Sequence, residues 1–411
     1  MDTLQQSLNQ VMASLPELFL ENLISKKLRD QGITAPKTLS GKIAKHILSG
    51  NSEPFVYKRG TYARDVTLDL KETDLDEMTH ALDRFCKTQL PKLLPDVAGR
   101  ISKTVLKDLK SRWVHEQALQ ETELSEFRKR LEDRWGKPLG QLRMLITMTR
   151  EWCQEAHNHV NSLKTSKKKQ VREILIRLLV RACQVTDEII CLLENGFADG
   201  AMARWITLHE IGVVATVISH HGESIAERYV AHQAVESKRA MNKYLSCCAP
   251  LEYKPLSARE VKKIIKAYDA AIAKYGKDFD ADYGWATLHL KKKRVTFSDL
   301  EAEAGRAEMR SYYQMGNDNV HAGVKSMFVR LGLLDDYSGL LAGRSNAGLM
   351  EPGQNAAHTL TQIAALVRLP GKFDDLVIGQ MIRMLRDEIP RSFYDADKRL
   401  RRDDKRYKAL N

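Results

Sequence analysis

The fold of this chain is decided by residues 171–196, which read VREILIRLLVRACQVTDEIICLLENG. Apolar side chains recur there at every third or fourth position, as they do along one face of an α-helix. They are Val171, Ile174, Leu175, Leu178, Ala182, Val185, Ile189 and Leu192. Asn195-Gly196 follows this stripe and is typical of a helix C-terminus. The stretch therefore predicts an amphipathic helix that must bury its apolar face against other helices.

The next segment predicts a second helix, from near Asp199 to His220-His221-Gly222. It is apolar nearly all round, which is typical of a helix in the middle of a bundle. Further helices are expected in the long proline-free tracts, because a proline inside a helix costs about 3 kcal/mol. They are expected at 224–245 and 257–275, each opened by a capping-box spacing, and at 298–320 with a break near Gly305.

The flanking regions also have helical patterns. Helices are expected at 15–31, 43–48, 75–86 and 97–135, and again from Leu376 onward. Residues 55–57 and 66–70 lie on either side of Lys58-Arg59-Gly60 and predict the chain's one candidate hairpin.

These patterns predict an all-α fold. A C-terminal multi-helix bundle is preceded by a mostly helical N-terminal region with at most one short hairpin. The expected division is an N-terminal region at 1–150, a helical bundle at 165–335 and a C-terminal helical extension at 336–411.

Composition narrows the class of protein. The 411 residues carry 65 Lys and Arg against 53 Asp and Glu, a net charge of +12, which permits a polyanionic partner such as RNA. The longest apolar run, 213–218, is far shorter than the roughly 20 residues of a membrane span, and the N-terminus does not read as a secretory signal. Six cysteines without a CxxC pair fit reduced thiols. We expect a soluble cytoplasmic protein with no membrane partner.

Motif searches exclude several enzyme classes. The chain contains no GxxxxGK[ST], GxGxxG, HExxH or GxSxG, so ATPase, dinucleotide, zincin and α/β-hydrolase chemistry lack support. Cys153, His157 and His159 have a C-x3-H-x-H spacing, but the two histidines point about 160° apart on a helix. We therefore expect no metal and no cofactor.

Basic clusters occur at two places in the chain. One contains Lys164, Lys167, Lys168, Lys169 and Arg172, and the other is 291–294. Such clusters either contact phosphates or form a solvated surface. No aromatic residues are interleaved with them, so stacking on single-stranded bases is not indicated.

The second bundle helix carries three polar residues in an otherwise apolar sequence: Arg204, His209 and Glu210. A buried charge is costly unless it is paired. Arg204 and Glu210 lie about 120° apart around the helix, so each is expected to meet a residue from another helix. The group forms either a structural tether between helices or a functional polar pocket.

The late helix carries a polar face. Arg310, Gln314, Asn317 and His321 share it, with Asp318 at its edge. A basic, amide and imidazole face suits anion binding or acid–base work on a phosphodiester, and the alternative is a solvated surface. About 16 Å of helix separates Arg310 from His321, so the two cannot hold one substrate atom together.

Two sets of residues carry a family resemblance. The segment from Ala203-Arg204 to Glu210, together with Tyr312-Tyr313 and the His321 that follows, resembles a bacterial family of unknown function numbered 5677, over roughly 165–335. That resemblance implies helical architecture but no known chemistry. More loosely, 315–323 is similar to part of the motif of the HEPN superfamily, an Arg followed after four to six residues by a His. Gln314, Met315 and Gly316 stand where that Arg would be.

The HEPN similarity implies a function. Many members are RNases of toxin–antitoxin and phage-defence systems, and they commonly dimerise to complete one site. By that similarity the chain would be an RNA-directed effector, as a metal-independent endoribonuclease or an RNA binder. Its catalytic residues would be His321 as acid/base, Asn317 to orient it, and Arg310 or Arg204 to stabilise charge. Binding residues would be Glu210, His209, Gln314, Asp318, Lys167, Lys168 and Lys169. The alternative is a non-catalytic helical binding or scaffold protein with a protein partner.

Overall fold

The computed structural model describes residues 2–33, 36–50, 53–57, 66–162, 169–321, 323–334, 339–367 and 371–410. Helices form nearly all the regular structure in these ranges, and no strand occurs in them. The all-α prediction is therefore confirmed. The chain divides into two compact units, Met1–Gln120 and Glu121–Asn411.

The first unit is a small helical assembly. It contains α1 (Asp2–Asp30), α2 (Lys37–Leu48), α3 (Glu72–Arg84), a π-helical turn (Phe85–Gln89) and the first part of α4 (Leu90–Ser162). Leu20, Ile24, Leu28 and Ala44 form its buried core between α1 and α2.

The predicted hairpin is not found in the described part of this unit. Residues 55–57 and 66–70 are irregular, and the turn at Lys58-Arg59-Gly60 lies outside the described residues. Two short strands without a third strand or a covering helix are marginal in water, which explains why the apolar residues there do not pair.

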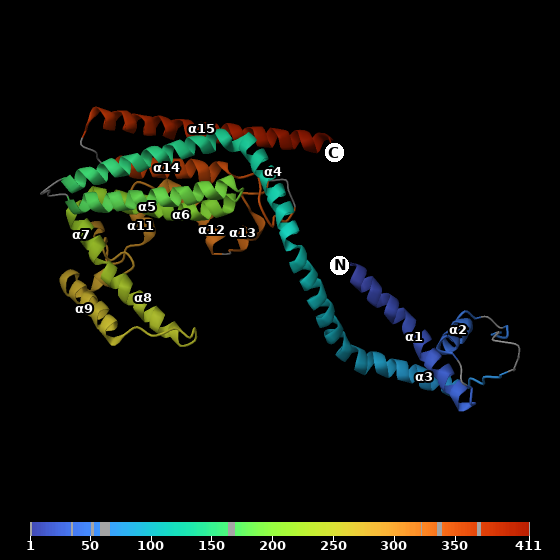
Figure 1. Cartoon of the computed structure of the whole chain (residues 1–411). Coiled ribbons are helices and arrows are strands. Elements are labelled where there is room, and N and C mark those ends of the chain that lie inside the picture. The colour runs from blue at the N-terminus through green and yellow to red at the C-terminus, as the bar shows by residue number, and fades with distance from the viewer. Residues whose placement is uncertain are drawn as a thin grey trace. The chain divides into compact units, whose positions relative to one another are not determined.

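The second unit is a helical bundle. Its long elements are the second half of α4, α5 (Lys169–Glu194), α6 (Ala198–His221), α14 (Met350–Leu366) and α15 (Phe373–Leu410). Figure 1 shows them running side by side, and α6 packs against both α5 and α14. Helices α14 and α15, which belong to the predicted extension 336–411, contribute to the same core as α5 and α6.

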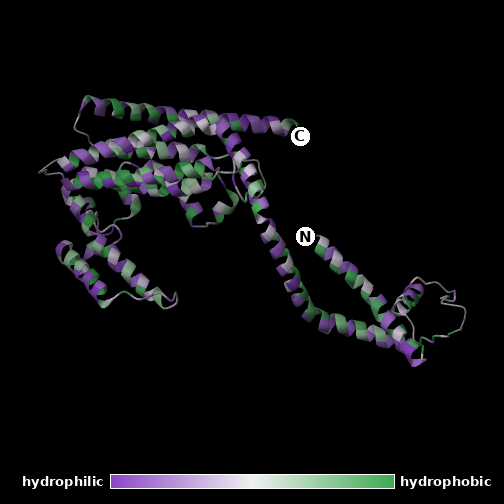
Figure 2. Cartoon of the chain, viewed as in Figure 1, coloured by the Kyte–Doolittle hydropathy of each residue, from purple (hydrophilic) through white to green (hydrophobic). Residues whose placement is uncertain are grey.

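Helix α6 lies in the middle of this bundle, as its sequence predicts. Figure 2 shows the apolar colour concentrated around α5 and α6. Among the described helices, α6 alone is long and apolar enough to cross a membrane, and 67% of its most apolar window is buried inside the protein. Such burial is typical of the core helix of a globular protein.

Shorter helices complete the unit. Helices α7 (Glu223–Ala231), α8 (Gln233–Cys248) and α9 (Ala258–Tyr275) follow α6, and then come a 3₁₀ turn (Lys277–Asp280) and α10 (Thr287–Leu290). After them lie α11 (Phe297–Glu303), a second 3₁₀ turn (Ala307–Met309), α12 (Arg310–Val320) and α13 (Val324–Phe328). The predicted break near Gly305 is confirmed, because that glycine has φ +64° and separates α11 from α12.

Several predicted helix boundaries are wrong, among them the start of α1, which begins at Asp2 and not near Leu15. Helix α4 continues through Gly136-Lys137-Pro138, where the sequence predicted an end. Trp135, Leu139 and Leu142 are fully or almost fully buried around that site, and their burial outweighs the cost of the proline.

The predicted helix 224–245 is interrupted at His232, which separates α7 from α8. Its predicted capping box does not form, because Glu227 pairs instead with Lys274 and accepts a hydrogen bond from Tyr275. The other predicted capping box is confirmed: Ser257 and Glu260 cap α9 reciprocally.

Three tryptophans donate hydrogen bonds to α14 or to the residues just before and after it. The indole N–H of Trp205 donates to the Thr359 hydroxyl at 3.1 Å, within the core. Those of Trp135 and Trp152 donate to the backbone oxygens of Asn346 and Val367, at 2.9 and 3.0 Å. Each large ring thus buries its apolar area while its one donor is satisfied.

Candidate functional site

One group of polar residues lies where α11 and α12 pack on α6. His209 of α6 and Glu301 of α11 are 2% and 1% exposed, and their Nε2 and Oε1 atoms are 2.8 Å apart. Arg310, at the start of α12, forms an ion pair with the other oxygen of Glu301. One carboxylate therefore receives an imidazole on one side and a guanidinium on the other. We call His209, Glu301 and Arg310 the buried triad.

Aromatic rings enclose the buried triad. Trp205, Phe297 and Tyr313 lie with ring centroids 5.0, 6.0 and 5.8 Å from that of His209. The Arg310 guanidinium lies 5.3 Å from the centroid of the Tyr313 ring. These rings keep water away from His209 and Glu301, which strengthens the charge interactions there, whereas Arg310 is 39% exposed.

Burial sets the protonation states of the triad. It lowers the pKa of His209 to about 4, with help from the positive charges of Arg306 and Arg310. Burial also raises the pKa of Glu301, and the Arg310 charge opposes that rise. At neutral pH a neutral His209 donates its Nε2 proton to Glu301, and Arg310 balances the carboxylate charge.

A second polar contact lies beside the triad. The Tyr313 hydroxyl donates to Oε1 of Glu210 at 2.9 Å, joining α12 to α6. Burial and the Glu210 charge raise the pKa of Tyr313, while a hydrogen bond with Asn317 acts in the opposite direction. Tyr313 therefore remains a phenol at neutral pH.

Arg204 lies outside this group. It forms an ion pair with Glu188 of α5, and one of its guanidinium nitrogens donates to the Thr207 hydroxyl at 3.2 Å. Arg204 and Glu210 thus both find their partners on other helices, as their positions around α6 predict. Neither arginine of the predicted site, Arg204 or Arg310, is free of an internal carboxylate.

The outer end of α12 carries the remaining candidates. His321 is exposed at the helix C-terminus, where its backbone N–H donates to the Asn317 carbonyl at 3.0 Å. Gln314 donates weakly to Asp318 at 3.4 Å, and Asp318 lies 3.9 Å from Lys325. The predicted polar face is therefore divided: Arg310 turns into the triad, and His321 faces outward.

The basic cluster before α5 is described only in part. Lys169 begins α5 and lies 3.9 Å from Glu173, one turn later. Lys167 and Lys168 lie outside the described residues.

Helix α12 packs closely against α6 at Gly316. A Cβ on Gly316 would lie 2.7 Å from a side-chain carbon of Ile206 and 3.1 Å from the Met202 carbonyl oxygen. Only glycine fits there without a shift, which lets Tyr313 reach Glu210.

Glu301, the centre of the triad, is not among the site residues predicted from the sequence. Its signal was its position: Glu301 comes four residues after Phe297 and three before Ala304, on the face of α11 that is otherwise apolar. A charged residue on such a face must find a partner, as His209 and Arg310 show.

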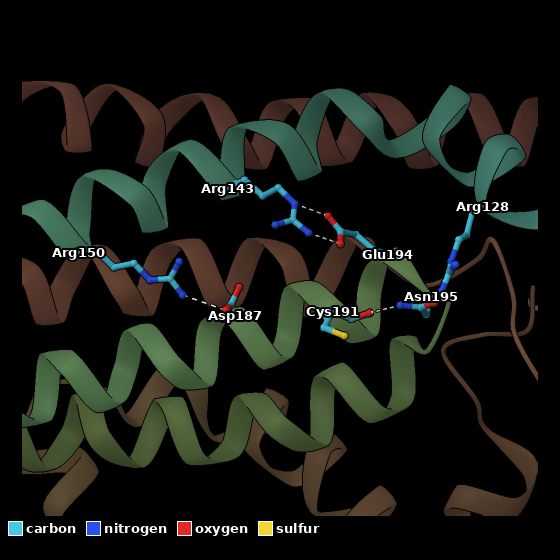
Figure 3. Close-up of polar contacts among 7 residues, drawn as sticks. All are labelled: Arg128, Arg143, Arg150, Asp187, Cys191, Glu194 and Asn195. Carbon is cyan, nitrogen blue, oxygen red and sulfur yellow. Dashed lines mark hydrogen bonds and ion pairs between the residues drawn. The ribbon is translucent and has the colours of Figure 1, made fainter. Parts of the chain in front are cut away.

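Polar contacts also join α4 to α5 and to the turn that follows α5, away from the triad. Figure 3 shows Arg143 with Glu194, Arg150 with Asp187, and Arg128 with Asn195. Open grooves border α4 on both sides. The groove between α4 and α15 is apolar and lined by Met144, Met148, Met381 and Met384.

Fold and site together define the class: an all-helical protein with a cluster of polar residues between α6, α11 and α12. Among the described residues, no three His, Cys, Asp or Glu side chains are arranged to hold a metal ion. Residues 172–338 match the model of a family of unknown function, DUF5677. No curated protein and no solved structure gives a significant match.

The matched residues begin in α5 and include α6, α11, α12 and the whole triad. They do not include α14 and α15, although α14 covers α6. The match supports the resemblance to the 5677 family over this part of the chain and implies no reaction.

Proposed function

We propose that this protein is a non-catalytic helical binding protein that works as a pair of identical chains. The observation that carries the proposal is a contrast between the polar candidates and the surface beside them. His209, Glu210, Arg204 and Arg310 all contact internal partners. Just beyond His321 the surface is apolar.

That surface is the α12–α13 patch, defined by Val320, Val324, Met327, Phe328 and Val329. Each of these side chains is at least half exposed, and Phe328 reaches 79%. Helix α13 packs against α12, so the patch is continuous with the outer end of α12. An exposed apolar cluster of this kind marks an interaction site.

A second copy of this chain is the partner we favour. A twofold axis brings the same patch from both chains together, and an apolar patch is complementary to itself. The one charged residue within 320–329 is Lys325, which lies 3.9 Å from Asp318 of its own chain. That carboxylate offsets part of the Lys325 charge that a second copy would meet.

Phe328→Asp tests this pairing. We expect the wild-type chain to sediment as a dimer, and the variant to dissociate at least about tenfold more readily because a carboxylate would be buried in the interface. Sedimentation equilibrium over a range of concentrations measures this.

Leu288→Asp is the matched control, since Leu288 is 63% exposed on α10, away from the patch. It should leave the association unchanged. A wild-type chain that is monomeric at every concentration, or an equal effect of both variants, would contradict the proposal.

An RNA-directed HEPN-like effector is the second candidate. The observation in its favour is the exposure of His321, with Asn317 one turn earlier on α12. Arg204 and Arg310 are both held by carboxylates of their own chain, so charge stabilisation would need an arginine of a second copy. The net charge of +12 suits a polyanionic partner.

His321→Ala decides between the two candidates. If the chain cleaves RNA through His321, the variant should lose at least about a hundredfold in rate, the usual effect of removing an acid or base. His220→Ala, at another histidine with an accessible ring, is the control. A wild-type chain that neither binds nor cuts RNA would leave only the binding role. A variant that cuts as fast as the wild type would show that His321 is not the acid or base, and would contradict the non-catalytic role as well.

A further inference from the structure

Two thiols from neighbouring helices meet in the second unit. Cys153 of α4 and Cys183 of α5 are 7% and 4% exposed, and their Sγ atoms are 4.0 Å apart. The pair is not used by the buried triad or by the α12–α13 patch. From 4.0 Å, the two sulfur atoms would have to approach by about 2 Å to reach the 2.05 Å or so of a disulfide bond.

The thiol pair is accessible from one side. Both cysteines line a groove of about 490 Å³ between α4 and α5, together with Arg150, His157 and Asp187. Arg150 and Asp187 form an ion pair at 2.9 Å along this groove. A small neutral oxidant can therefore reach sulfur atoms that are otherwise buried.

We infer that Cys153 and Cys183 form a reversible dithiol–disulfide site whose substrate is a small hydroperoxide such as hydrogen peroxide. The inference is independent of the proposed function, since it rests on the α4–α5 contact alone. In the cytoplasmic location expected from the sequence, thiols are kept reduced and a disulfide forms only transiently.

The reaction has two steps. The Cys153 thiolate attacks one peroxide oxygen, so that an S–O bond forms, the O–O bond breaks, and the departing hydroxide takes a proton to become water. Cys183 then attacks the sulfenic sulfur: the S–S bond forms, the S–O bond breaks, and the second hydroxide leaves as water with the Cys183 proton. Two thiols and one molecule of hydrogen peroxide thus give one disulfide and two waters.

The surroundings of the two thiols indicate which of them reacts first with the peroxide. A hydrogen bond with Cys183 lowers the pKa of Cys153, and the same contact together with burial raises the pKa of Cys183. Cys153 is also the more exposed of the two, at 7% against 4%, so we assign it as the first nucleophile. Cys183 is the resolving thiol.

The disulfide would staple α4 to α5. Besides the apolar core that they share, these helices are joined across the seam by the pairs Arg143–Glu194 and Arg150–Asp187, which are partly exposed (Figure 3). Exposed ion pairs hold helices weakly, whereas a covalent bond restricts the unfolded chain. The oxidised protein should consequently melt at a higher temperature than the reduced one.

The test uses the full chain, fully reduced, with hydrogen peroxide added in increments under native conditions. We expect two of the six thiols to be lost together, a peptide map that links Cys153 to Cys183, and full recovery of both thiols with dithiothreitol. Mass spectrometry and thiol titration measure this on the wild-type protein, so the result does not depend on whether a variant folds.

Cysteine variants test which two thiols form the disulfide. Cys153→Ser and Cys183→Ser should each abolish the linked peptide, while Cys191→Ser should keep it, since Cys191 is exposed on the same helix as Cys183. In denaturant the preference for the Cys153–Cys183 link should disappear, because the fold brings the two thiols together. Oxidation of Cys191 while Cys153 and Cys183 remain thiols, or a link that involves another cysteine under native conditions, would overturn the inference.

Discussion

Glu301→Ala is expected to lower the free energy of unfolding by about 3 kcal/mol, among the largest effects of any single substitution outside the apolar core. The side chain is 1% exposed and accepts from His209 while pairing with Arg310. Its removal leaves the His209 N–H without an acceptor inside a ring of aromatic residues. It also leaves Arg310 without a counter-charge, although that side chain is 39% exposed and recovers some hydration.

Urea denaturation followed by circular dichroism measures this loss. Glu303→Ala, two residues later on the same helix, is the matched control. Glu303 pairs with His221 at the surface, so its loss should cost no more than about 1 kcal/mol. Equal effects of the two substitutions would mean that the triad contributes nothing beyond an exposed ion pair.

The second large effect is a loss of stability in mild acid that originates at His209. The pKa of this imidazole is 6.5 in the unfolded chain and about 4 in the folded one. Between these values the unfolded state binds a proton that the folded state does not, so stability is fully present above pH 6.5 and falls toward pH 4. A difference of 6.5 − 4 = 2.5 pKa units corresponds to about 3 kcal/mol.

The measurement is the difference between wild type and His209→Gln in unfolding free energy at about pH 7 and at about pH 4.5, on either side of the ordinary histidine pKa. Glutamine can still donate to Glu301 but does not titrate, so the variant should lose less stability in acid than the wild type. Carboxylates shared by both proteins cancel in the comparison. A wild-type profile no steeper than that of His209→Gln would contradict the assignment.

The helical architecture was predictable because apolar spacing determines it. The stripe at 171–192 and the almost wholly apolar sequence of α6 predict two helices packed in a bundle, and both helices lie there. Boundaries were less predictable, because distant contacts decide them. Trp135 finds its acceptor on Asn346, more than two hundred residues away, and that contact helps to carry α4 through Pro138.

The candidate site was predictable only in part. The presence of charges on an apolar helix indicated that Arg204 and Glu210 must have partners on other helices. Their identities, Glu188 and Tyr313, depend on how α5 and α12 pack around α6, which spacing along one helix does not encode. For the same reason Arg310 and His321, on one face of α12, end in different environments.

Because most of the tryptophans are buried in the second unit, tryptophan fluorescence reports on the unfolding of that unit. Four of the five tryptophans lie in Glu121–Asn411, at positions 135, 152, 205 and 285, and all except Trp152 are at most 3% exposed. Trp113, in the first unit, is 48% exposed. Intrinsic fluorescence should therefore shift to longer wavelength mainly when the bundle opens, while far-ultraviolet dichroism follows the helices of both units. If the unfolding transition seen by fluorescence differs from a second transition seen by far-ultraviolet dichroism, the two units unfold independently.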